Sequence, residues 1–423
     1  MSAVALTRAS QVLTLAGDAG ARAGAAQAEL GILEDASLVI DPQTQKISWV
    51  GAHADYLAAR ARGELELSEE RDCAGAVLMP AMVDPHTHLV WGGHRRDELE
   101  LRLRGADYEE IFAAGGGILS SVRQTRAASE DELVSQSRAR IERMKACGTT
   151  SFEIKSGYGL ELDAELRQLR AARRLGEEAG VRVKTTCLAA HAIPAEARGS
   201  EAGRADFIAR VCAEILPAVA EAGLADYVDV FCDRGALTKA ESAKVLGAAV
   251  ELGLALRVHA NEFGHTGGAE LAAEFGAKSA DHLLHMSAHE RAALREAGVV
   301  ATLLPGTSLV LGKPYADGRA LVEDGVAVAI ASDCNPGSCA LENLAMVLGL
   351  ACYGCKLSPA EAILAATHNA AVSLDLAAEV GRLEVGMCAD LLVLGTNDYR
   401  DLVYHAGSPL VRELWSRGQR VLP

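Results

Sequence analysis

Side chains that could hold a metal ion or move a proton follow the apolar segments of this chain. Directly after the apolar run 77–83 comes Asp84-Pro85-His86-Thr87-His88, in which both imidazoles face one side of an extended segment. Five later segments are followed by Lys155 with Tyr158, His191, His259 with Glu262, Asp281 with His282, and Ser332 with Asp333. An isolated His-x-His is weak evidence for a metal. Histidines and acids after six different segments are hard to explain by packing, so the pattern predicts a shared site.

The residue types indicate one hydrolytic metal ion. His86, His88 and His259 offer three neutral nitrogen ligands, and Asp333 offers an anionic oxygen. This set suits Zn²⁺ or Fe³⁺ with a position left for water, whose pKa the metal lowers toward neutrality. A second ion would need a bridging carboxylate or carboxylated lysine, and residues 230–233 end the fourth strand without a lysine. We therefore predict one divalent or trivalent ion per chain.

A sequence pattern that recurs seven times indicates a scaffold that could bring these residues together. Each repeat consists of an amphipathic helix, a glycine and a short apolar strand. The glycines are Gly148, Gly180, Gly223, Gly253, Gly276, Gly298 and Gly325. Glycine just past a helix end takes the left-handed cap at little cost, and the apolar strands are typical of strands buried on both faces. Adding the run 77–83 makes eight strands. The pattern predicts an α/β fold, a closed (β/α)₈ barrel with its site at the C-terminal strand ends. A doubly wound open sheet is the competing interpretation.

The flanks have a different pattern. Residues 31–51, 381–395 and 409–422 look like short strands separated by turns, too few at either end to bury a face alone. We expect both ends to pair into one small β-sandwich-like domain, residues 1–76 plus 381–423, beside a barrel of residues 77–380. The long connection 90–147, with Gly115-Gly116-Gly117, is either an extra helix with a hinge or an active-site cover.

Composition limits the classes of partner. The 423 residues include 41 Lys+Arg and 57 Asp+Glu, a net charge of −16, which argues against broad binding to nucleic acid or anionic membranes. We find no apolar run near the roughly 18 residues that span a bilayer, and no signal-peptide pattern at the start. Ten cysteines without a regular framework, including Cys352 and Cys355, indicate ordinary reduced thiols. We expect a cytoplasmic protein that acts on a small molecule.

Six segments carry a resemblance to a known family. They are HTHLVWGGHRRDELELRLRGADYEEIFAAGGGI (86–118), KSGYGL (155–160), AHAIP (190–194), ANEF (260–263), ADHL (280–283) and SDCNPGS (332–338). With them the chain resembles the metal-dependent amidohydrolase superfamily and, more narrowly, the imidazolonepropionase family. Members of that family open 4-imidazolone-5-propanoate to N-formimidoyl-L-glutamate in histidine degradation. Segments 86–118 and 155–160 make the narrower match.

The resemblance implies a role for each site residue. His86, His88, His259 and Asp333 would be the metal ligands, Glu262 the catalytic acid/base, and His282 would face the reacting carbonyl. The substrate would be bound by Arg95, Tyr158, His191, Asn335, Gly337 and Ser338. Ser338 stands where many relatives have threonine. A homodimer is expected from the resemblance alone.

The residues themselves agree with a small anionic substrate. The forked guanidinium of Arg95 suits a propanoate, and an acid such as Asp97 or Glu98 on the same segment is its alternative partner. For Lys155 we favour a structural ion pair over substrate binding.

Two other functions stay open at this point. One is a related deaminase of a purine, pyrimidine or triazine ring, which would use similar ligands but has no need of a carboxylate clamp. The other is a non-catalytic barrel scaffold, which would be expected to lack a ligand or the acid/base. Arg95 with Tyr158 favours the acidic substrate, and no ligand is missing.

Overall fold

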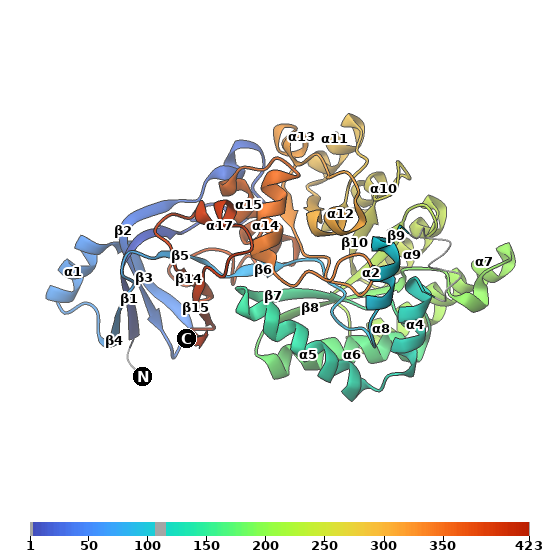
Figure 1. Cartoon of the computed structure of the whole chain (residues 1–423), viewed down its shortest axis with the longest axis horizontal. Coiled ribbons are helices and arrows are strands. Elements are labelled where there is room, and N and C mark those ends of the chain that lie inside the picture. The colour runs from blue at the N-terminus through green and yellow to red at the C-terminus, as the bar shows by residue number, and fades with distance from the viewer. Residues whose placement is uncertain (1–2, 106–115, 423) are drawn as a thin grey trace.

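The computed structural model describes residues 3–105 and 116–422 and contains two eight-stranded sheets (Figure 1). The parallel sheet runs in the order β13-β12-β11-β10-β9-β8-β7-β6. Its strands are β6 (Met82–Asp84), β7 (Thr149–Lys155), β8 (Arg182–Ala190), β9 (Tyr227–Cys232), β10 (Ala255–Ala260), β11 (Ser279–His282), β12 (Val300–Leu303) and β13 (Val328–Ile330). Sequence order equals spatial order throughout, as the predicted (β/α)₈ barrel requires.

The barrel closes through the segments that follow its first and last strands. His88 N donates to Cys334 O at 2.9 Å, Asp333 N donates to His86 O at 3.1 Å, and Thr87 pairs with Cys334 as a parallel bridge. The seam of the barrel is therefore made by the residues predicted to hold the metal.

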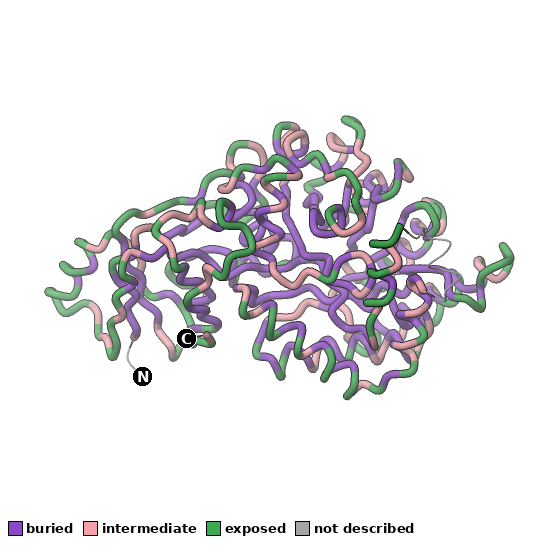
Figure 2. Tube along the Cα trace, viewed as in Figure 1, coloured by how far each residue is buried: buried purple, intermediate pink, exposed green. Residues whose placement is uncertain are grey.

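Helices cover the outside of the barrel, while its strands are buried (Figure 2). The α-helices that accompany it are α2 (Arg96–Leu103), α4 (Ile118–Ala127), α5 (Glu130–Ala146), α6 (Leu162–Ala179), α7 (Glu201–Arg210), α8 (Leu216–Glu221), α9 (Lys239–Glu251), α10 (Gly268–Glu274), α11 (Ala288–Ala297), α12 (Pro305–Leu311), α13 (Gly318–Glu323), α14 (Leu344–Tyr353), α15 (Pro359–Ala365) and α16 (His368–Ser373). Short 3₁₀ turns η1 (Gly24–Ala28) and η2 (Ala195–Ala197) and a π-helical segment η3 (Val211–Ile215) complete this layer. All seven glycines of the repeated sequence pattern have positive φ, so the predicted helix ends are confirmed.

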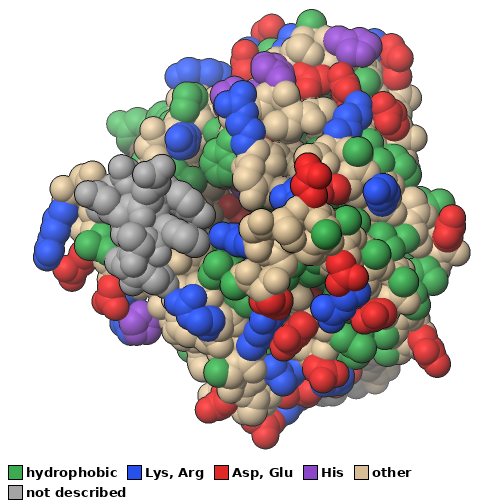
Figure 3. Space-filling view, turned by 90° about the vertical axis from the view of Figure 1, so that its right-hand side faces the viewer, with side chains coloured by type: hydrophobic (Ala, Val, Ile, Leu, Met, Phe, Trp, Pro, Cys, Tyr) green, Lys and Arg blue, Asp and Glu red, His purple; other side chains and the backbone are tan. Residues whose placement is uncertain are grey.

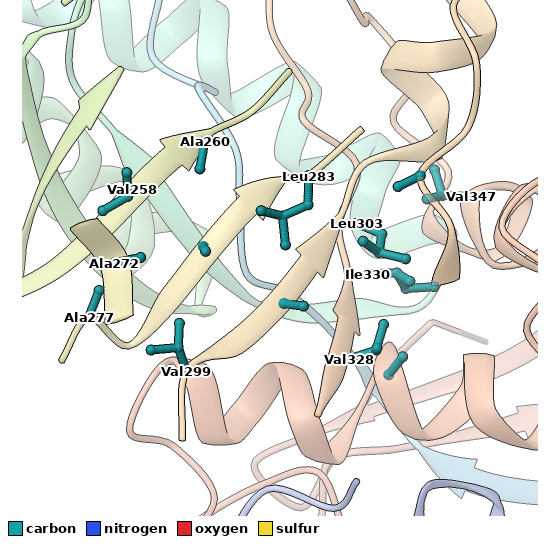
Figure 4. Packing of buried hydrophobic residues seen from close by; sticks show 14 of the residues in the cluster. Val258, Ala260, Ala272, Ala277, Leu283, Val299, Leu303, Val328, Ile330 and Val347 are labelled. Atoms are coloured by element: carbon teal, nitrogen blue, oxygen red, sulfur yellow. The ribbon is translucent and has the colours of Figure 1, made fainter. Parts of the chain in front are cut away.

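Apolar side chains fill the space between strands and helices. Val258, Leu303 and Ile330 extend from β10, β12 and β13, and Val347 of α14 packs beside the last two (Figure 4). All four residues are buried in one cluster that runs around the barrel. This continuous core fixes the strand ends in place, and with them the polar residues that follow.

The second sheet is built from both chain ends, as predicted. Its order is β16-β15-β14-β5-β1-β2-β3, with β4 paired to β1. The strands are β1 (Ala3–Leu13), β2 (Ile32–Asp41), β3 (Lys46–Ala52), β4 (Leu67–Asp72), β5 (Val77–Pro80), β14 (Leu391–Leu394), β15 (Val411–Ser416) and β16 (Gln419–Leu422), with α1 (His53–Ala61) and α17 (Asp401–Tyr404) in the connections. Strands β1 and β4 were not anticipated individually.

One expectation about the barrel is corrected. The apolar run 77–83 is not a single barrel strand, because β5 pairs with β1 and β14 in the second sheet and only β6 enters the barrel. A run buried on both faces looks the same whether it stays in one sheet or passes between two, so composition could not separate them. The exact division into residues 1–76 plus 381–423 and residues 77–380 stays a prediction.

The connection 90–147 holds α2, α4 and α5. Gly117 caps the N-terminus of α4 with a φ of 77°. Residues 106–115 of this connection, with Gly115 of the predicted hinge, lie outside the described residues, so the extra helix with a hinge and the active-site cover both stay predictions.

The outer surface carries both signs of charge. On the face in Figure 3, Lys and Arg side chains lie among Asp and Glu side chains rather than in one basic patch. Among the helices in the described ranges, none combines the length and the apolar character needed to cross a membrane.

Candidate metal centre and active site

The polar residues at the C-terminal strand ends surround one cavity of about 580 Å³. Its lining includes every predicted site residue except His86: His88, Arg95, Tyr158, His191, His259, Glu262, His282, Asp333, Asn335, Gly337 and Ser338. His86 lies beneath its floor with no exposed surface. The fold thus gathers in one place the residues that the sequence spreads over 253 positions, from 86 to 338.

Four donor atoms at the floor have the spacing of a ligand set. Asp333 Oδ1 lies 3.5 Å from His86 Nε2 and 3.6 Å from His88 Nε2, and His88 Nε2 lies 3.4 Å from His259 Nε2. Tetrahedral donors about 2.1 Å from one ion are roughly 3.4 Å apart. His86 Nε2 is buried and has no hydrogen-bond partner among the described residues. A cation would satisfy these atoms.

Hydrogen bonds on the far side leave these donor atoms free. His86 Nδ1 donates to Asp281 Oδ2 at 2.7 Å, and His259 Nδ1 donates to Asp229 Oδ2 at 2.9 Å, with both tautomers assigned from their partners. Thr307 Oγ1 donates to Asp333 Oδ2 at 2.5 Å, which leaves Oδ1 for the centre.

Two further imidazoles come close to this set. His191 and His282 each place a nitrogen within 4.8 Å of two of the other histidines, so distance alone does not single out four ligands. Burial holds the pKa of His86, His88 and His282 well below the usual histidine range, and neighbouring positive charge adds to it. Burial lowers the pKa of His191 to about 3. All four rings are therefore neutral near pH 7, the form that binds metals.

A buried ionic network supports the floor from below. Lys155 Nζ lies 2.7 Å from Glu153 Oε1, 2.8 Å from Asp229 Oδ2 and 3.9 Å from Asp281 Oδ2, and all four side chains are fully buried. Burial alone would lower the pKa of Lys155, but Asp229 and Glu153 hold it above its usual range. The interpretation of Lys155 as a structural ion pair is confirmed.

Sequence reasoning missed the partners in this network. Asp229 and Arg257 are single charged residues inside otherwise mostly apolar strands, and Glu153 stands two residues before Lys155 in β7, which was the available signal. Arg257 donates to Pro85 O at 2.8 Å and so holds the turn that carries His86.

Glu262 and His282 face the cavity from neighbouring strand ends. Glu262 Oε2 lies 3.8 Å from His282 Nε2, and the backbone amides of Glu262 and Phe263 both donate to Asp233 Oδ2, at 2.6 and 2.9 Å. Burial raises the pKa of Glu262 well above its usual range, and the charge of Asp333 adds to this. A carboxyl group with a raised pKa can both accept and return a proton near neutral pH.

Tyr158 and His191 form one wall. The ring of His191 stacks on that of His88 with centroids 5.0 Å apart, and Tyr158 lies 5.5 Å from His191. His191 Nδ1 donates to Gly157 O at 3.1 Å, which fixes the ring.

Another part of the cavity wall is a tight turn after Asp333. Asn335 Nδ2 donates to Asp333 O at 2.7 Å and to Ser338 Oγ at 2.8 Å, and its Oδ1 accepts from the amides of Gly337 and Ser338. These hydrogen bonds link Asp333 to Gly337, four residues away, through the side chain of Asn335.

Arg95 does not present a free fork to the cavity. Its Nε and Nη2 donate to the two oxygens of Glu98 at 2.9 and 2.7 Å, the alternative pairing considered from the sequence. A Cβ on Gly337 would lie 2.0 Å from Arg95 Nη1, so the guanidinium covers this glycine closely.

The class of protein follows from a family model together with this site. The model of the amidohydrolase family matches residues 77–421, and the chain belongs to that family. Within the family, the chain groups with the imidazolonepropionases. It is 42% identical to that of Shouchella clausii over 99% of this chain and 92% of that protein. It is 44% identical to that of Deinococcus radiodurans over 95% of this chain and 96% of that protein.

Solved structures share the fold at lower identity. An adenosine deaminase from Xanthomonas campestris with bound zinc has a TM-score of 0.71 at 19% identity, over 99% of this chain and 92% of that one. Guanine deaminase of E. coli has a TM-score of 0.73 at 15% identity, over 100% of this chain and 99% of that one. Such likeness shows the fold alone and does not favour the deaminase alternative. Family membership and the donor cluster together support a metal ion in this cavity.

Proposed function

We propose that the chain hydrolyses the cyclic amide of 4-imidazolone-5-propanoate to give N-formimidoyl-L-glutamate, a step of histidine degradation. The observation that carries this proposal is 42–44% identity to imidazolonepropionases over at least 95% of the chain. A cavity with an acid/base, a donor cluster and several cations supports it.

One metal ion, Zn²⁺ or Fe³⁺, would be held by His86, His88, His259 and Asp333. Such an ion acidifies a water molecule and polarises the carbonyl that the water attacks. The donor spacing near 3.5 Å supports this ligand set. His259→Ala should lose most of the ion, as measured by elemental analysis, whereas two tightly held ions per chain would contradict a single site.

The chain's own groups complete the hydrolysis. Glu262 takes a proton from the attacking water as its oxygen bonds to the ring carbonyl carbon. The same carboxyl then delivers a proton to the ring nitrogen as the carbon–nitrogen bond breaks, leaving a carboxylate and an amidine. His282, 3.8 Å from Glu262, would face the carbonyl oxygen. Their burial supports this exchange because it keeps bulk water out.

The remaining residues would orient the substrate. Tyr158 and His191 would contact the ring from one wall, and Asn335, Gly337, Ser338 and Arg95 would receive the propanoate end. A homodimer and a cytoplasmic location are proposed on family resemblance and thiol content, to be tested by sedimentation and cell fractionation.

The decisive experiment follows the ultraviolet absorbance of 4-imidazolone-5-propanoate with metal-loaded protein, with N-formimidoyl-L-glutamate identified by mass spectrometry. We expect stoichiometric conversion without ammonia release. Ammonia from a purine, pyrimidine or triazine, with no conversion of the imidazolone, would instead indicate a deaminase.

A further inference from the structure

Arg95, the N-cap residue of α2, and Arg102 within that helix meet at the same glycine of the cavity wall. Arg95 and Arg102 are seven residues apart, about two helical turns, and both line the cavity. Arg102 Nη2 donates to Gly337 O at 2.9 Å, and Arg95 packs on the Cα of Gly337. Gly337 is held to the ligand Asp333 through Asn335, so both cations lie at the end of the turn away from the donor cluster.

Only one of these two cations has a carboxylate partner among the described residues. Glu98 accepts from Arg95 through both oxygens and also from Gly117 N at 3.0 Å. No ion pair involves Arg102 in the described ranges, and its Nε is buried without a hydrogen-bond partner there. Burial and the positive charge of Arg95 lower the pKa of Arg102, and the negative charge of Glu98 offsets them only in part.

We propose that Arg102 binds the propanoate of the substrate and sets the preference for an anionic substrate, an inference that rests on the proposed function. Arg102 lines the cavity without a carboxylate partner among the described residues, whereas the fork of Arg95 is already occupied by Glu98. Arg95, locked by Glu98, then acts beside it by shaping the wall at Gly337 and offering Nη1.

A purely structural role is the alternative for Arg102. Its bond to Gly337 O would be enough to support the turn, and any donor of similar length could replace it. That role does not account for a guanidinium that lines the cavity and has no carboxylate partner in the described ranges, a position in which an anionic ligand would gain charge-assisted hydrogen bonds.

The test compares Arg102→Met with wild type on two compounds, 4-imidazolone-5-propanoate and its neutral propanamide. A lost charge-assisted hydrogen bond should lower kcat/KM for the acid about 10- to 150-fold, mainly through KM. Turnover of the amide should change little. Arg102→Lys should recover part of the loss. Arg104→Met is the matched control, because Arg104 is exposed on the same helix end and pairs with Glu100.

Equal losses on acid and amide would overturn the proposal in favour of structural support, and no loss on the acid would overturn it outright. If wild type converts neither compound, the proposed function fails, and calorimetry with imidazole propanoate and imidazole propanamide decides the role of Arg102. Wild type should bind imidazole propanoate at least about 10-fold more tightly than imidazole propanamide, and Arg102→Met should bind the two compounds with equal affinity. If wild type binds the propanoate and the propanamide with equal affinity, the proposal is overturned.

Discussion

At the residue scale, the proposed hydrolysis assigns the proton transfer to Glu262. It is buried beside His282, its amide is held by Asp233, and its pKa is raised by burial and by Asp333. Glu262→Gln keeps the shape and removes the proton acceptor, so kcat should fall by about 10²–10⁴ while metal content stays unchanged. Steady-state kinetics with elemental analysis measures both.

Glu274→Gln is the control, because Glu274 is exposed on α10. Nearly normal kcat in Glu262→Gln would mean that another group, such as Asp333 or His282, carries the proton.

At the scale of elements, one lysine ties three strands together. Lys155 ends β7 and contacts Asp229 of β9 and Asp281 of β11, which hold His259 and His86. Lys155→Met leaves buried carboxylates unpaired, so the free energy of unfolding should fall by about 3–5 kcal/mol in urea without metal. Metal affinity should fall about 10- to 100-fold, because the imidazoles lose their orientation.

Lys184→Met is the matched control on β8, where Lys184 pairs with Asp226 and the two side chains are 26% and 24% exposed. Its cost should stay below about 1 kcal/mol. Similar losses in both variants would show that the buried network does not support the strand ends in this way.

At the scale of the whole molecule, the second sheet and the barrel share a core. Leu392 of β14 belongs to the barrel's cluster and lies near Met82 and Gly148. Leu392→Ala should therefore lower the free energy of unfolding by about 2–5 kcal/mol, with one cooperative calorimetric transition for the whole chain.

The exposed Leu57→Ala on α1 should change stability little, because Leu57 already contacts water. Two separate transitions, with only one shifted in Leu392→Ala, would show that the sheet and the barrel unfold independently.

The eight-stranded barrel could be predicted because its signals are local. Each glycine cap, apolar strand and following polar residue, such as Gly253, the strand 255–260 and His259, lies within a few positions in the sequence. One parallel topology then brings all C-terminal strand ends to one face. The candidate site could be predicted for the same reason.

The sequence by itself thus determined which residues stand at the strand ends. Only the tertiary structure decided which partners they have. Asp229 and Asp281 behind the histidines, Glu98 on the fork of Arg95, and β5 in the second sheet all depend on contacts between distant segments or on side-chain direction. The local sequence pattern identifies each strand and the polar residues that follow it. Which side chains form hydrogen bonds depends on differences of a few tenths of an ångström in donor–acceptor distance, and these distances are set only once the core has packed.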